Sequence, residues 1–128
     1  DEIIDSVFRE LENRLREFVQ SKEYETYFTY KLNEAADAVL AMKAIPRKAE
    51  ICFAVYDYDH RLKLAETAAQ RLMGRGIRVT FQKSEKDFDF IGGCVIGLPT
   101  IGKVIDNSMK SDVLKEREQF LSWSNLSL

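Results

Sequence analysis

The residues best suited to chemistry lie in one short segment, where Asp57, Asp59 and His60 fall within four positions. An imidazole beside carboxylates can transfer protons as a general acid or base. His60 is the only histidine of the chain, so any serine or cysteine that needs an imidazole base would have to meet it here. A small hydrolase that uses these three side chains is therefore one hypothesis.

A structural interpretation of the same segment needs no activity. It falls at a predicted passage from a strand to a helix, where Asp57 or Asp59 can act as the helix cap. Aspartates are expected there, because the exposed N–H groups of a helix start carry partial positive charge. We favour capping over catalysis on this ground.

The other motifs point away from a cofactor or a metal ion. Gly92 and Gly93 could be taken for a phosphate-binding loop, but no Lys-Ser or Lys-Thr pair follows them. They lie in a strand pattern, where glycine marks a bulge or a place of close packing. One histidine with Cys52 and Cys94 far apart gives no metal-ligand spacing, so we expect no cofactor and no metal. Both cysteines lie in apolar strand patterns, which favours buried thiols over a bridge between neighbouring strands.

Hydrophobic periodicity predicts the first half of the scaffold that positions these residues. Apolar residues at steps of three and four predict a helix over residues 3–19. A second helix follows, with Ser21 as its N-cap and Pro46 closing it. Its aromatic residues have helical spacing and no basic flanks, which favours core packing over base stacking; they are Tyr24, Tyr27, Phe28 and Tyr30.

The second half alternates strands and helices. Residues 50–56 are apolar on both faces and predict a central strand, and a helix from the 57–59 region ends at Gly74 and Gly76. Residues 77–82 alternate and predict an edge strand, residues 90–96 and 103–105 predict a hairpin, and Ser108 caps a last helix that includes Phe120 and Leu121. The sequence thus predicts one α+β domain over residues 1–128, with a four-stranded mixed sheet flanked by helices in the order α-α-β-α-β-β-β-α.

Composition limits the possible partners. The chain has 128 residues, of which 19 are Lys or Arg and 21 are Asp or Glu, giving a formal charge of −2. No overall positive field exists to attract nucleic acid or anionic lipid, so we expect no nucleic-acid partner. The longest apolar run, over residues 91–98, is far below the roughly 20 residues of a membrane-spanning helix, so we expect no direct membrane insertion. Without a leader-like start, a cytoplasmic location is the expectation.

The C-terminal third carries a resemblance. Its residues are Phe90-Ile91-Gly92-Gly93-Cys94-Val95-Ile96, followed by Gly102-Lys103-Val104-Ile105-Asp106-Asn107-Ser108-Met109. Together with the order of elements, this pattern resembles the C-terminal globular domain of the E-type peripheral-stalk protein of A/V-type ATPases, which serves as their stator. The chain departs from the family pattern at residues 98–102, at Ser108 in place of threonine, and at Asp112 where the family commonly has arginine.

The resemblance implies a non-catalytic role in ATP-coupled proton or sodium transport. A long helix upstream of Asp1 would pair with a second, helical stalk subunit in a coiled coil, and the domain would dock on the non-catalytic head subunit and resist torque. The complex would be cytoplasmic and peripheral to the membrane. We predict that the partner helix meets the apolar residues nearest the start, although they could equally pack only within the domain: Ile3, Ile4, Val7, Phe8 and Leu11.

A related stator of the flagellar or type III secretion export ATPase is the alternative within the binding class. It shares the plan of a helical arm followed by a domain. Upstream sequence separates the two, since glycine repeats at three-to-four spacing favour the export stator and charged heptads favour the rotary ATPase.

Overall fold

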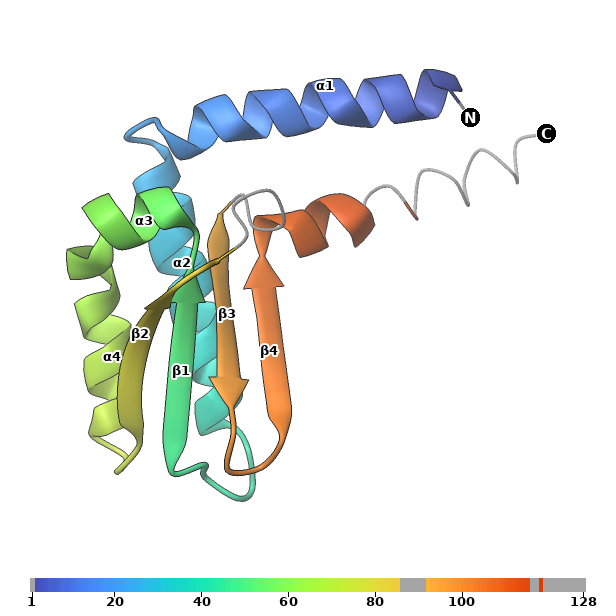
Figure 1. Ribbon diagram of the computed structural model, residues 1–128. Coiled ribbons are helices and arrows are strands. Elements are labelled where there is room, and N and C mark those ends of the chain that lie inside the picture. The colour runs from blue at the N-terminus through green and yellow to red at the C-terminus, as the bar shows by residue number, and fades with distance from the viewer. Residues whose placement is uncertain (1, 86–91, 116–117, 119–128) are drawn as a thin grey trace.

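A four-stranded mixed sheet lies at the centre of the computed structural model, which describes residues 2–85, 92–115 and 118 (Figure 1). The strand order is β2-β1-β3-β4. β1 pairs with β2 in parallel and with β3 antiparallel, and β3 and β4 form an antiparallel hairpin. The strands are β1 (Lys48–Phe53), β2 (Arg78–Lys83), β3 (Gly93–Leu98) and β4 (Lys103–Ser108).

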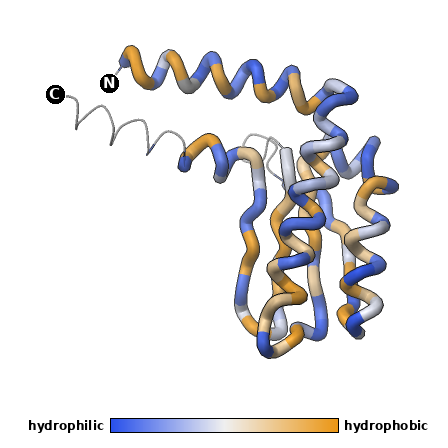
Figure 2. The backbone as a smooth tube through the Cα atoms, turned by 180° about the vertical axis from the view of Figure 1, so that it is seen from behind, coloured by the Kyte–Doolittle hydropathy of each residue, from blue (hydrophilic) through white to orange (hydrophobic). Residues whose placement is uncertain are grey.

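Helices pack on one face of this sheet, while α1 (Glu2–Val19) runs past one end of it (Figure 1). The others are α2 (Tyr24–Leu40), α3 (Val55–His60), the 3-10 helix η1 (Leu62–Ala65) and α4 (Glu66–Met73), and residues 109–115 are also helical. α2 and α4 run along the covered face, as the view from behind shows (Figure 2). The buried residues of β1 alternate with half-buried ones, because only one face meets the helices.

The fold class and the order of elements are confirmed. β1 lies inside the sheet and β2 at its edge, as predicted, and β3 and β4 form the predicted hairpin. The predicted cap of the last helix is also confirmed, since the Ser111 N–H donates to Ser108 Oγ at 3.2 Å. Phe90 and Ile91 of the predicted strand, and Phe120 and Leu121 of the predicted last helix, lie outside the described residues.

The strand predicted over residues 50–56 ends early, at Phe53. Ala54 has extended backbone (ψ 153°) and is the N-cap of α3, so Val55 and Tyr56 begin a helix. The single helix predicted after the strand is divided into α3, η1 and α4. The break occurs at Arg61, whose φ of −130° is far from helical values and whose side chain turns inward.

The limits predicted for the second helix are also wrong. Ser21 does not cap α2; its hydroxyl donates to the Phe18 carbonyl at 2.6 Å and so satisfies the last turn of α1. α2 starts after Glu23, which makes no side-chain cap bond, and ends at Leu40, well before Pro46. A proline excludes helix at its own position but does not determine where the helix before it stops.

The core lies between α2 and the sheet. Tyr24 and Phe28 are fully buried, with ring centroids 5.7 Å apart, and Phe28 meets Phe53 of β1 at 5.7 Å. The predicted core role of the aromatic set is thus confirmed for these two members. Tyr27 is half-buried, whereas Tyr30 is 62% exposed and lies outside the core.

The two thiols differ in burial, which gives a first testable prediction. The prediction of two buried thiols is confirmed for Cys94, whereas Cys52 is only half-buried on the open face of the sheet. Burial raises the pKa of both thiols, that of Cys94 to about 12. Since the thiolate is the reactive form, we expect Cys52 to react with a disulfide reagent at pH 8, and Cys94 to react only as fast as the domain opens. Reaction kinetics of the parent and of Cys52→Ser measure this. The prediction would be contradicted if both thiols of the parent reacted equally fast, or if neither reacted because the two cysteines form a disulfide.

Candidate functional site

The structure does not bring Asp57, Asp59 and His60 together. Asp57 is fully buried inside α3, whereas Asp59 is on the surface and pairs with Lys83 at 2.8 Å. The exposed ring of His60 packs on Tyr56, with centroids 4.5 Å apart. Neither aspartate occupies the N-cap of α3. Among the residues that the structure describes, no group of three or more metal-ligating side chains occurs.

Asp57 belongs to a buried structural network. Its two carboxylate oxygens accept from the Tyr24 hydroxyl at 2.8 Å and from the Arg61 guanidinium at 2.9 Å. Burial raises the pKa of Asp57, while the bonds from Tyr24 and Arg61 oppose that shift. Arg61 also donates to the Ser21 carbonyl at 3.1 Å and lies over the Tyr24 ring. In the described part of the chain, no buried side-chain nitrogen or oxygen of this network lacks a hydrogen-bond partner, as a buried position requires.

The double glycine completes this network from the side of the sheet. The Gly93 N–H donates to the Tyr24 hydroxyl at 2.7 Å. A Cβ on Gly92 would lie 2.7 Å from the same hydroxyl, and a Cβ on Gly93 would lie 2.5 Å from the Asn107 carbonyl oxygen. Gly93 also has φ +76°, which side chains rarely adopt. The interpretation of these glycines as sites of close packing is therefore confirmed.

The strongest candidate for a binding surface is α1. Among the described residues, α1 packs on the core through its C-terminal part, where Val19 is buried and Leu15 and Phe18 are partly buried. The rest of the helix extends past the sheet (Figure 1). Of the five residues predicted to meet a partner, Ile3 and Val7 are 75% and 54% exposed, and Ile4 and Leu11 are half-buried. The side chain of Phe8 lies outside the described part of the structure.

A cleft of about 290 Å³ lies between α1 and the helical residues 109–115. Leu11 and Leu15 of α1 form one wall, and Met109 and Val113 form the other. Leu114, next along the second helix, is 49% exposed. The apolar stripe of α1 therefore continues across the cleft onto a second helix. We call this stripe the two-helix surface; it comprises Leu11 and Leu15 of α1 with Met109, Val113 and Leu114 of the second helix. The residues of the second helix were not predicted as part of it, because periodicity shows burial without showing which elements meet.

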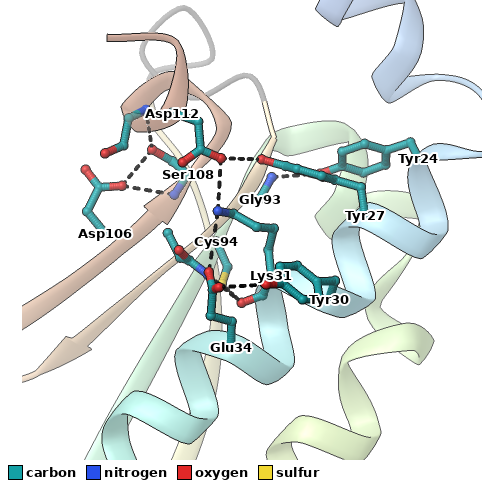
Figure 3. A network of polar contacts seen from close by, with 12 residues as sticks. Tyr24, Tyr27, Tyr30, Lys31, Glu34, Gly93, Cys94, Asp106, Ser108 and Asp112 are labelled. Atoms are coloured by element: carbon teal, nitrogen blue, oxygen red, sulfur yellow. Dashed lines mark hydrogen bonds and ion pairs between the residues drawn. The ribbon is translucent and has the colours of Figure 1, made fainter. Parts of the chain in front are cut away.

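Polar contacts hold the second helix in place (Figure 3). Asp112 accepts from the Tyr27 hydroxyl at 2.9 Å and pairs with Lys31 Nζ at 2.9 Å. Burial opposes the charge of Lys31, but Asp112 and Glu34 outweigh it and raise the Lys31 pKa, so the side chain stays cationic. Asn107 Nδ2 donates to the Lys31 carbonyl at 2.7 Å and ties β4 to α2. Asp112 thus positions the second helix against α2.

Sequence reasoning missed these positioning residues. Arg61 stands four residues after Asp57, a spacing that places the two side chains on one helix face and that could have suggested a pair. Lys31 and Asp112 are 81 positions apart, and no local pattern joins them.

No helix in the described ranges is both long enough and apolar enough to cross a bilayer. Comparison with known proteins finds no match among protein-family models or curated proteins.

Proposed function

We propose that this domain is a non-catalytic, protein-binding stator component of an A/V-type rotary ATPase, and that it links the ATPase head to the membrane sector through the peripheral stalk. The observation that carries the proposal is the apolar face of α1, which leaves the body of the domain with Ile3 and Val7 largely exposed. A stalk domain needs such a helix, because its first helix must continue into a coiled coil with a second subunit.

The sequence resemblance over residues 90–109 supports the same role. Its described part forms the hairpin of β3 and β4 and the capped start of the helix at 109–115. Asp57 is buried, Asp59 pairs with Lys83, and His60 packs on Tyr56, which supports protein binding over the hydrolase hypothesis. A surface that binds protein remains the function best supported by the geometry.

The proposal is tested by placing charge on the apolar face of α1. We expect Ile4→Asp combined with Leu11→Asp to weaken the complex of the full-length protein with its helical stalk subunit by about 100-fold or more, because each substitution removes a buried aliphatic contact worth about 1.5–3 kcal/mol. Titration calorimetry of the two purified subunits measures this.

The matched control is Ser6→Asp with Asn13→Asp, which adds two charges at the same seven-residue spacing on the opposite, exposed face. It should leave the affinity within about twofold, since surface changes away from a contact have small effects. Equal losses of affinity in both variants, or no loss in either, would refute the proposed interface on α1. Co-purification with an export ATPase in place of a rotary ATPase would change the proposed complex to an export ATPase, and α1 would still be the binding surface.

A further inference from the structure

Positive charge gathers at the end of the sheet opposite α1. Three connections meet there, between α2 and β1, between α4 and β2, and between β3 and β4 (Figure 1). Residues 41–49, 72–79 and 97–105 contain no aspartate or glutamate, although the chain has 21 of them. They carry six of the 19 basic residues, which together we call the basic end: Lys43, Arg47, Lys48, Arg75, Arg78 and Lys103.

This end contains a formed cleft. Its volume is about 540 Å³, and its lining comprises Arg47, Lys48, Gly76, Arg78 and Thr100, one or two from each connection. Backbone contacts hold the three segments together. The Arg47 N–H donates to Thr100 Oγ1 at 3.2 Å, and the Arg78 N–H donates to the Arg47 carbonyl at 2.9 Å. The two arginines are thus anchored side by side at their main chains.

The charge of the cleft is largely uncompensated within the chain. Lys48 pairs with Glu50 at 3.3 Å. Neither the Arg47 nor the Arg78 guanidinium has a carboxylate partner among the described residues, and both side chains are exposed. Gly76 lines the cleft without a side chain, and the space where its Cβ would lie is open. Two unpaired guanidinium groups whose main chains are anchored in one cleft can each pair with a carboxylate.

We propose that the basic end is a second docking surface, which binds an acidic segment of a partner protein through Arg47 and Arg78. Bidentate pairing with aspartate or glutamate relieves the mutual repulsion of the two cations and fills the cleft between the three connections. The site is separate from the two-helix surface, and its occupancy does not depend on the stator role.

An acidic protein segment fits this surface better than nucleic acid does. Six cations on three short connections form a compact end and do not form a stripe that follows a phosphate backbone. In the described aromatic contacts, no ring stacks against Arg47 or Arg78 to form a platform for bases.

The test is a titration of the isotope-labelled 128-residue chain with a twelve-residue peptide of glutamate and aspartate, followed by NMR. We expect saturable amide shifts at residues 47, 48, 76, 78 and 100, and we expect Arg47→Glu with Arg78→Glu to weaken binding by about tenfold or more. Both side chains are exposed and unpaired, so the variant should keep its melting temperature. A twelve-residue thymidine oligonucleotide at the same ionic strength provides the comparison.

The control is Lys22→Glu with Lys63→Glu, which makes the same change of net charge at exposed positions outside the basic end. It should change the peptide affinity by no more than about twofold. An equal loss in the control variant would show that only overall charge matters, and tighter binding of the oligonucleotide would assign the surface to nucleic acid; either result overturns the proposal. Failure here leaves the α1 interface untouched, because that test uses a different partner and a different end of the domain.

Discussion

Replacing Gly93 by alanine is expected to lower the free energy of unfolding by about 2–5 kcal/mol, through backbone strain of about 1–2 kcal/mol and overpacking of about 1–3 kcal/mol. The strain arises because Gly93 has φ +76°. The overpacking arises because the new methyl group would lie 2.5 Å from the Asn107 carbonyl oxygen, which is main chain and cannot rotate aside. The shift would also disturb the bond from the Gly93 N–H to Tyr24.

Gly76→Ala separates the two causes. Gly76 has nearly the same backbone angle, φ +80°, but nothing lies within 4 Å of the position of its Cβ. We expect this variant to lose only the strain, about 1–2 kcal/mol. Urea denaturation of both variants and the parent measures the difference in the free energy of unfolding, provided that its dependence on urea concentration has the same slope in all three proteins. Equal losses would mean that the contact between β3 and β4 is not tight at Gly93.

Asp57→Ala is the second substitution with a large expected effect. It removes the carboxylate that receives bonds from Tyr24 and Arg61 and leaves the guanidinium buried, with 7% of its side chain exposed, beside no anion. Breaking a buried ion pair from one side costs about 3–5 kcal/mol. Thermal and urea unfolding should both show this loss.

Asp59→Ala is the matched control, because it removes a carboxylate two residues away on the same short helix. Its pair with Lys83 is exposed, with 42% of the Asp59 side chain accessible, so we expect a change of at most about 1 kcal/mol. The hydrolase hypothesis predicts a different pattern, in which Asp57, Asp59 and His60 matter for turnover and Asp57 matters little for folding. A stable Asp57→Ala protein would contradict the structural role of this carboxylate.

The elements that the sequence predicts well are those whose signal is local. The helix over residues 3–19, the edge strand over residues 77–82 and the cap at Ser108 each follow from spacing within about 20 positions, and the structure confirms them, with the strand one residue later at Arg78–Lys83. The strand predicted to end at residue 56 fails, because Val55 and Tyr56 have strand-forming side chains but occupy the first turn of α3. Contacts with distant segments override local propensity there.

The candidate surfaces are predictable to a lesser degree. The stripe on α1 is visible from periodicity alone, but the helix at 109–115 that lies across from it is not, since Leu11 and Val113 are far apart in the chain. The buried role of Asp57 was missed because an aspartate next to a histidine suggests chemistry or capping, and only the packed structure reveals Tyr24 and Arg61 as its partners.

The position of Arg61 has a mechanical consequence. Its guanidinium is bonded to the connection between α1 and α2 through the Ser21 carbonyl and to α3 through Asp57, and it lies against the rings of Tyr24 and Tyr56. One side chain therefore ties the base of α1 to both α2 and α3. We expect Arg61→Ala to remove this tie, so that the orientation of α1 relative to the sheet varies more widely than in the parent.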